Sequence, residues 1–107
     1  MLPKKNRVNA KEVNKIFKEG RFLVSPNLTF KYVKNQNQEI KISFIVPKSV
    51  AKLAVKRNLL RRRGYAALSK YLDQFPLGLV GVFVFKKYQE DILIIENEIK
   101  NILKKIN

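Results

Sequence analysis

The stretch LVGVFVF, residues 79–85, is apolar at every position. A strand with one solvated face alternates apolar and polar residues, whereas a short continuous apolar run is typical of a strand buried on both faces. The turn residues of FPLG, 75–78, stand directly before it. We therefore expect residues 79–85 to form a strand within a sheet on which helices pack.

Alternation of apolar and polar residues predicts the other strands. It is regular in 28–34, where Leu28, Phe30 and Tyr32 share one side, and again in 40–46. A shorter strand is predicted at 21–25, and the polar stretch NQNQ, 35–38, is interpreted as a hairpin loop.

Three helices complete the predicted order α-β-β-β-α-β-α. Asn9 and Glu12 have the spacing of a capping box, and Gly20 ends the first helix. Ser49 is placed to cap a long second helix that runs to about Tyr71. The closing helix is marked by isoleucines at helical spacing, namely Ile92, Ile95, Ile99, Ile102 and Ile106. The predicted fold class is α+β, a single-domain sandwich with helices on a four-stranded sheet.

Composition narrows the possible functions. The 107 residues suffice for one domain, 1–107, because two domains would leave neither with an adequate core. The chain has no cysteine and no histidine, so thiol nucleophiles, thiolate metal sites and the commonest general base are excluded. The absence of cysteine suits a reducing cytoplasm. The longest apolar run is too short to cross a bilayer.

Positive charge is concentrated in part of the chain. Residues 1–72 hold 18 basic and 3 acidic residues, whereas residues 73–107 hold 5 of each, so the first part carries the whole net charge of +15. Residues 40–72 contain nine basic residues and no acid. Charge of one sign on part of a small domain is typical of a polyanion-binding site. A membrane surface is the weaker alternative, since it requires an amphipathic helix without a core of its own.

The predicted second helix carries most of these charges. Its apolar side is predicted to pack on the sheet through Leu53, Leu60, Ala67, Leu68 and Tyr71. One edge of that side is lined by Lys52, Lys56, Arg63 and Lys70, whereas Arg57 and Arg61 flank the other and Arg62 points outward. A merely solvated helix has no reason to use arginine three times in succession. Arginine suits phosphate because its planar donors bind in pairs.

The segment VPKSVAKLAVKRNLLRRR, 46–63, resembles the signature of the protein component of bacterial ribonuclease P. The segments KKNRV (4–8), VNKIFKEG (13–20) and TFKYVK (29–34) look like further parts of that family, as do the isoleucine-rich last helix and the element order. The resemblance covers essentially the whole chain. It implies a rare left-handed βαβ crossover around the basic helix, which periodicity alone cannot decide.

The resemblance implies an accessory protein of an RNA-based endonuclease. In that family the RNA subunit, with bound magnesium, removes the 5′ leader of precursor tRNA, so the expected partners are ribonuclease P RNA and precursor tRNA, in the cytoplasm. No protein catalytic residue, protein-bound metal, membrane or DNA is expected. A carboxylate metal site is the weaker interpretation of four acids that suit a helix amino terminus or an exposed helix face, Glu90, Asp91, Glu96 and Glu98.

The family's functional positions carry over as three groups. RNA contacts are expected in the basic helix and the turn before it, at Lys48, Lys52, Lys56, Arg57, Asn58, Arg61, Arg62 and Arg63. Leu59 departs from the family pattern, in which an arginine follows Asn58. Further RNA contacts are expected near the amino terminus at Lys5, Asn6 and Arg7. A cleft between the first helix and the sheet is expected to receive the leader at Val13, Phe17, Lys31 and Tyr32.

Three alternatives stay open at this stage. A core position is as good an interpretation of Phe17 as a cleft position, because helix faces usually pack inward. A structural ribosomal protein is the main alternative function, since ribosomal RNA also clamps basic helices. A binder of double-stranded DNA would need a helix-turn-helix or a dimer interface, and neither is evident in the sequence.

Overall fold

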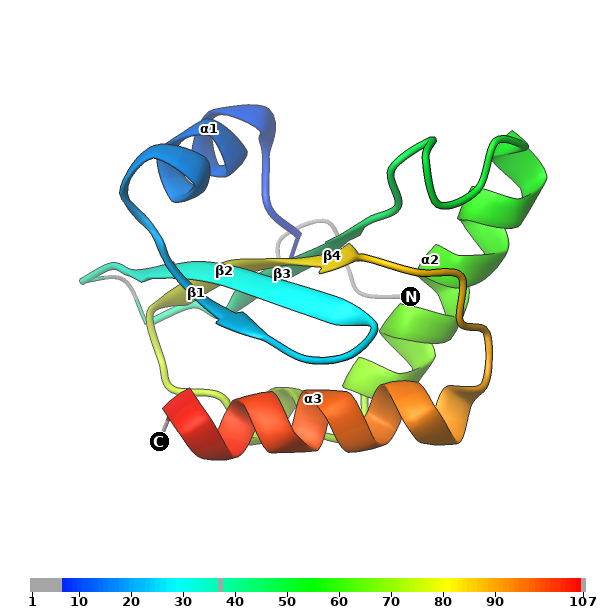
Figure 1. Cartoon of the computed structure of the whole chain (residues 1–107). Coiled ribbons are helices and arrows are strands. Elements are labelled where there is room, and N and C mark those ends of the chain that lie inside the picture. Colours follow the sequence, from blue (N-terminus) through cyan, green and yellow to red (C-terminus); the bar gives the residue numbers. More distant parts are fainter. Residues whose placement is uncertain (1–6, 37, 107) are drawn as a thin grey trace.

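The structure, a computed structural model, describes residues 7–36 and 38–106. This part of the chain has the predicted order α-β-β-β-α-β-α, with a short 3-10 helix inserted after the second helix. The elements are α1 (Ala10–Glu19), β1 (Arg21–Val24), β2 (Leu28–Lys34), β3 (Lys41–Ile45), α2 (Ala54–Leu68), η2 (Leu72–Gln74), β4 (Leu79–Phe85) and α3 (Ile92–Ile106) (Figure 1). Within the described ranges, no helix combines the length and apolarity needed to cross a membrane.

β4 is a central strand, as its apolar sequence predicts. The strand order is β1-β2-β4-β3, with β4 antiparallel to β2 and parallel to β3. Val80 and Val82 pack with Ile16 of α1 on one face, whereas Leu79 and Phe83 belong to the larger core on the other. The prediction of a strand buried on both faces is confirmed.

The prediction of a hairpin between β2 and β3 is wrong, because β4 lies between them. The 79–85 run is apolar at every position and supplies buried residues to both faces, which suits an inner strand. Strands that are neighbours in the sequence are thereby separated. The chain leaving β2 instead meets the chain entering β4, where the Asn35 N–H donates to the Gly78 carbonyl at 2.7 Å.

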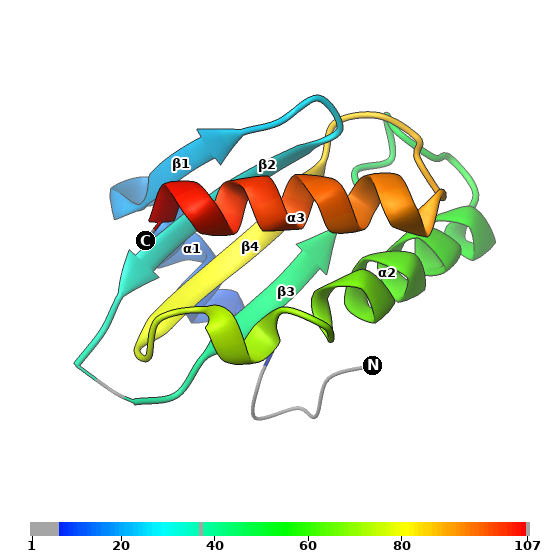
Figure 2. The same cartoon turned by 90° about the horizontal axis from the view of Figure 1, so that it is seen from below.

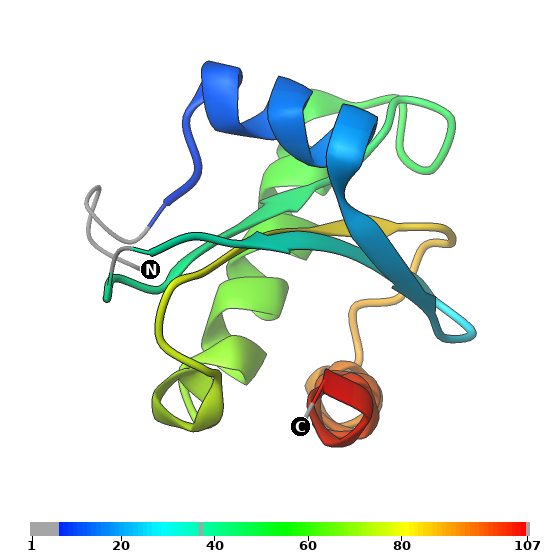
Figure 3. The same cartoon turned by 90° about the vertical axis from the view of Figure 1, so that its left-hand side faces the viewer.

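Two layers of helices enclose the sheet. α1 covers one face, and α3 with the carboxyl-terminal part of α2 covers the other (Figures 1, 2 and 3). The chain passes from β3 to the parallel β4 through α2 and η2 on the α3 side. Seen from that side with both strands pointing upward, β4 lies to the left of β3 (Figure 2). The crossover is therefore left-handed, as the resemblance implies, although about 98% of such units are right-handed.

Stacked aromatic rings form the centre of the core on the α3 side. The ring centroids of Phe30 and Phe83 are 4.3 Å apart, and those of Phe44 and Phe83 are 5.0 Å apart. Two glycines permit this packing. A Cβ atom on Gly81 would lie 2.4 Å from the Phe30 ring, and one on Gly64 would lie 2.6 Å from the Phe44 ring. Gly64 thus lets α2 approach β3 directly.

α2 begins at Ala54 and not directly after Ser49, so the cap predicted at Ser49 is wrong. The chain first makes a tight turn, in which the Pro47 carbonyl accepts from the N–H groups of Val50 at 3.0 Å and Ala51 at 3.3 Å. The turn thereby takes the Ala51 N–H, from which a capping Ser49 side chain would accept. The helix also ends earlier than predicted, and the chain then turns into η2.

The apolar side of α2 fits between β3 and α3. Leu60, Ala67 and Leu68 are buried as predicted, and Tyr71 is partly buried. Leu53 is 62% exposed, so its predicted core position is wrong: it precedes the first helical turn. Tyr65 lies outside the predicted apolar side but is buried, and its hydroxyl accepts from the Phe44 N–H of β3 at 3.3 Å.

Two acids of α3 are buried, although an exposed face was expected for them. Glu98 is 6% exposed, and its carboxylate accepts from the Asn27 N–H at 2.8 Å, from Asn27 Nδ2 at 2.5 Å and from the Ser25 hydroxyl. It therefore fixes the β1–β2 turn against α3. Glu96 is also 6% exposed and faces α2. Both residues flank the isoleucine stripe, and neighbouring elements cover both flanks.

Glu96 forms an ion pair across the two helices with Lys70, whose Nζ lies 2.6 Å from Glu96 Oε1. The close contact with this carboxylate and its negative charge raise the pKa of Lys70 above the ordinary value of 10.5. The stabilisation from a raised pKa is complete below the unfolded pKa and is lost only as the pH rises through the folded one. The pair therefore contributes fully at neutral pH.

Candidate nucleic-acid interface

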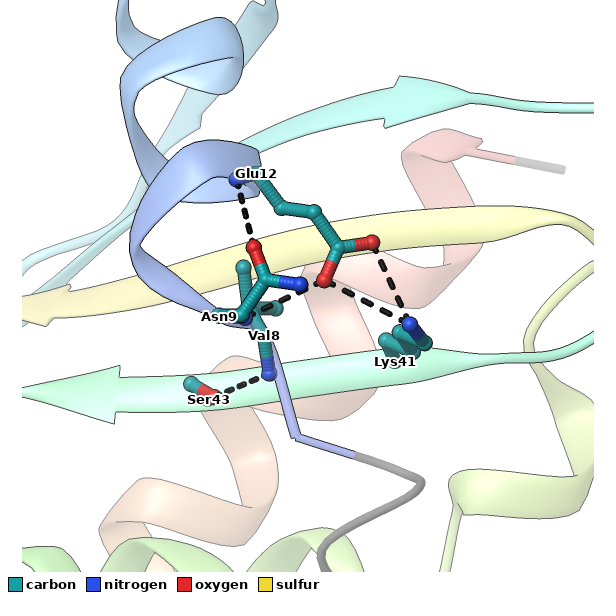
Figure 4. Close-up of polar contacts among 5 residues, drawn as sticks. All are labelled: Val8, Asn9, Glu12, Lys41 and Ser43. Carbon is teal, nitrogen blue, oxygen red and sulfur yellow. Dashed lines mark hydrogen bonds and ion pairs between the residues drawn. The ribbon is translucent and has the colours of Figure 1, made fainter.

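A polar network fixes the segment before α1 over β3 (Figure 4). The Val8 N–H donates to the Ser43 hydroxyl at 2.7 Å. Asn9 and Glu12 form the predicted capping box, with distances of 2.9 and 3.1 Å. The Glu12 carboxylate also pairs with Lys41 of β3 at 3.4 Å. These contacts determine where Arg7, the residue before Val8, leaves the sheet.

Arg7, the residue before this network, reaches α2. It lines a hollow of about 320 Å³ together with Asn58, Arg61, Arg62 and Tyr65. Arg61 donates to the side-chain oxygen of Asn58, one turn earlier on the helix. The fold thus brings one of the predicted amino-terminal residues together with three of the predicted helix residues. Lys5 and Asn6 lie outside the described residues.

Arg57 has a structural contact that the sequence did not predict. Its Nη1 donates to the carbonyls of Ala51 at 3.0 Å and Lys52 at 2.7 Å, and the side chain is half-buried. It thereby holds the loop that precedes α2. Its other N–H groups have no partner within the described part of the chain, so they can still donate to a phosphate.

The other predicted basic residues lie on the surface around α2. Lys48, Lys52, Lys56, Arg62 and Arg63 are exposed. On the edge toward α3, Lys56 Nζ lies 6.0 Å from the centroid of the Tyr88 ring. Among the residues that the structure describes, no acid forms an ion pair with the basic residues of 48–63. The positive charge of this surface is therefore available to a polyanion.

A second candidate surface lies on the α1 side of the sheet. Phe17 is 46% exposed, so the interpretation of this residue as core is wrong. Lys31 of β2 extends toward it, with Nζ 4.6 Å from the centroid of the Phe17 ring. Val13 is half-buried and packs with Ile16 beneath the helix. Three of the four predicted cleft residues thus share one side of the sheet.

Tyr32 does not join them. Its ring stacks on Phe30, with centroids 5.4 Å apart and planes 14° apart, and it packs against the core on the α3 side. Lys31, its neighbour in β2, points to the opposite face. Tyr32 therefore lies on the other face of the sheet from Phe17 and Lys31. It lines a groove of about 460 Å³ at the end of the sheet, together with Lys15 and Glu19 of α1 and with Arg21 and Lys34. Its contact with the leader stays a prediction.

Sequence reasoning also missed Tyr65 and Ser43. Tyr65 lies four residues after Arg61, which places it on the same side of a helix, and this spacing was an available signal. Ser43 is the polar position of an alternating strand, and nothing in the sequence indicates that it accepts from Val8.

The acids considered for metal binding do not form a cluster. Asp91 accepts from the Leu93 N–H at 3.0 Å at the start of α3, as expected for a helix amino terminus, and Glu90 accepts from the Tyr88 hydroxyl at 3.0 Å. In residues 7–36 and 38–106, no three acidic side chains are close enough together to hold a metal ion.

The fold is similar to those of solved bacterial proteins. The RNase P protein from Thermotoga maritima aligns with a TM-score of 0.83 and 22% identity, over 94% of this chain and 97% of the other. The RNase P protein of Staphylococcus aureus aligns with a TM-score of 0.81 and 19% identity, over 97% of this chain and 100% of the other. At these identities the likeness shows the fold.

No curated protein matches the chain in sequence. The model of the Ribonuclease P family, in contrast, matches residues 2–107. This match covers the basic surface of α2, the α1 surface and the core between them. Because it spans almost the whole chain, the chain belongs to the Ribonuclease P family.

Proposed function

We propose that the chain binds the RNA subunit of ribonuclease P through α2 and Arg7, and the 5′ leader of precursor tRNA through the α1 side of the sheet. Family membership supports a role in ribonuclease P and a partnership with its RNA. The side chains on each surface support the assignment of the RNA subunit to one and of the leader to the other.

The hollow beside α2 is the observation that best supports binding of the RNA subunit. Arg7, Arg61 and Arg62 converge there around Asn58 and the hydroxyl-bearing ring of Tyr65. Guanidinium groups bind phosphate oxygens in pairs, and an amide side chain can donate or accept beside them. Because Arg7 and α2 are distant in the sequence, this arrangement exists only in the folded protein. Such a preformed arrangement suits the recognition of one constant partner, the RNA subunit.

Phe17 and Lys31 support the proposal for the leader. An exposed ring offers a stacking surface to any base, and a nearby ammonium group can move to an adjacent phosphate. Stacking of this kind requires an unpaired nucleotide, which the single-stranded leader supplies and which mature tRNA, having no leader, does not offer at its 5′ end. The surface should accordingly distinguish precursor from product.

We propose that the RNA subunit, with its bound Mg²⁺, performs the hydrolysis. The chain has neither histidine nor cysteine, so it lacks the commonest general base and a thiolate. Its buried acids already have partners, since Glu98 holds the β1–β2 turn and Glu96 pairs with Lys70. The protein would contribute binding and position rather than chemistry. A cytoplasmic location is part of the proposal and suits a chain without cysteine.

Reconstitution tests the proposal. Protein purified free of RNA should leave precursor tRNA intact in the presence of Mg²⁺, and should stimulate cleavage by the cognate RNA subunit at low salt. Cleavage by the protein alone would contradict the proposed division of chemistry. Failure to stimulate the RNA subunit would contradict the proposed role, and is the result expected of a structural ribosomal protein.

A further inference from the structure

Two of the seven phenylalanines are exposed, and they stand apart from the others. The remaining five are at most 3% exposed and belong to the core: Phe30, Phe44, Phe75, Phe83 and Phe85. Phe17 is 46% exposed and Phe22, on the edge strand β1, is 64% exposed. Single exposed apolar residues are common on proteins, but exposed aromatic rings that lie together indicate a surface that a partner covers.

The strand register places Phe22 on the same side of the sheet as Phe17. Phe22 is directly opposite Lys31 in the β1–β2 pair, and residues opposite each other project to the same face. Lys31 extends over the Phe17 ring, so this face is the α1 side. Leu23, the next residue of β1, packs against the core on the other side. Lys31 therefore stands between the two exposed phenylalanines.

We infer that Phe22 is a second base-stacking residue, so that the leader passes from α1 over Lys31 to the β1 edge of the sheet. The inference rests on the proposed function of the α1 side. It adds Phe22 to the residues proposed for this surface, and it predicts that the protein contacts at least two unpaired leader nucleotides.

Charge favours RNA as the occupant of this surface. A cation between two exposed rings is the arrangement expected for a strand whose bases stack and whose phosphates alternate with them. Arg21, the exposed residue before Phe22, is opposite Tyr32 and so projects to the other face, which leaves Lys31 as the cation between the two rings. A second copy of the chain would bring its own charge of +15 to a basic surface, and the resulting repulsion disfavours that occupant.

The test uses the reconstituted holoenzyme and precursor tRNAs with leaders of increasing length. The holoenzyme with Phe22→Ala should bind mature tRNA and precursor tRNAs with short leaders as the unaltered holoenzyme does. It should bind precursor tRNAs with longer leaders about fivefold or more weakly. Phe22→Tyr keeps an aromatic ring and should retain the affinity. Leu93→Ala is the matched control, because Leu93 is 65% exposed but lies on α3, across the sheet.

Phe17→Ala and Lys31→Ala, measured in parallel, distinguish the inference from the proposed function. If these two variants lose affinity for the leader while Phe22→Ala binds every leader normally, the inference is overturned and the leader surface stands. If none of the three changes leader affinity, the proposed function of this side fails as well. Concentration-dependent dimers that disappear in Phe22→Ala would assign the surface to a second copy and would also overturn the inference.

Discussion

Substitutions at Arg57 and Arg62 should distinguish effects on the stability of the protein from effects on its affinity for RNA. Both belong to the basic helix, but Arg57 donates two hydrogen bonds to loop carbonyls and Arg62 has no partner among the described residues. Arg62→Ala should therefore remove only an RNA contact. Arg57→Ala should remove an RNA contact and release the loop before α2.

The expected magnitudes follow from these contacts. Surface substitutions without partners change the free energy of unfolding by about 0.5 kcal/mol or less, which is our expectation for Arg62→Ala. Hydrogen bonds from a charged donor contribute roughly 1.5 to 3 kcal/mol each, but the bond to Lys52 is exposed and is discounted. For Arg57→Ala we expect a loss of about 1 to 2 kcal/mol. Each lost phosphate contact should lower the salt slope of log K by about 0.7 to 0.9.

Urea unfolding and RNA binding at several salt concentrations measure the two effects independently. Arg57→Lys is an informative control, since it retains the charge but loses the planar pair of donors. It should recover part of the salt slope without recovering the stability. The reasoning is refuted if Arg62→Ala binds the RNA subunit with an unchanged salt slope, or if Arg57→Ala unfolds at the same urea concentration as the unaltered protein.

Two further substitutions test the fold. Tyr32→Ala removes a half-buried ring that stacks on Phe30, so it should lower the free energy of unfolding by about 1 to 3 kcal/mol and affect the binding of precursor and mature tRNA alike. A selective loss of precursor binding in a normally melting protein would instead support the predicted role of Tyr32 in leader binding. Glu98→Ala leaves the half-buried Asn27 N–H without its charged acceptor and should cost about 2 to 3 kcal/mol in urea unfolding. Glu98→Gln should cost less, because an acceptor oxygen remains.

The strands and helices with a regular apolar pattern were predictable from the sequence, because a repeat of about 3.6 residues indicates a helix and a repeat of about two residues indicates a strand. β2 and β4 occupy the predicted residues, 28–34 and 79–85, and the isoleucine stripe of α3 spans the predicted helix. The capping box at Asn9 and Glu12 fixed the start of α1. Such signals are local, since a strand or helix face depends on residues a few positions apart.

Strand pairing and the burial of acids were not predictable in this way. The sequence shows that the 79–85 run is buried, but not which strands lie beside it, and the hairpin prediction failed on that point. Glu96 and Glu98 occupy polar positions of an amphipathic helix. They are buried because α2 and the β1–β2 turn, far away in the sequence, cover both flanks of α3.

The opposite faces of Lys31 and Tyr32 are predictable from the sequence. The two are consecutive residues of one strand, and consecutive side chains of a strand point to opposite faces. The alternation of 28–34 already groups Tyr32 with Leu28 and Phe30. The resemblance supplies residue types and order, whereas the strand period decides which face each residue occupies.

The basic helix shows why the proposed RNA-binding surface depends on the core. Like charges at helical spacing destabilise an isolated helix, and α2 has neither a side-chain cap nor an acid in its first turn. It is held instead by tertiary contacts, because Leu60 and Leu68 are fully buried and Gly64 permits close packing on Phe44. Since packing supplies the stability, the exposed positions of α2 are free to carry arginine and lysine. Repulsion among these residues is then relieved when RNA neutralises them.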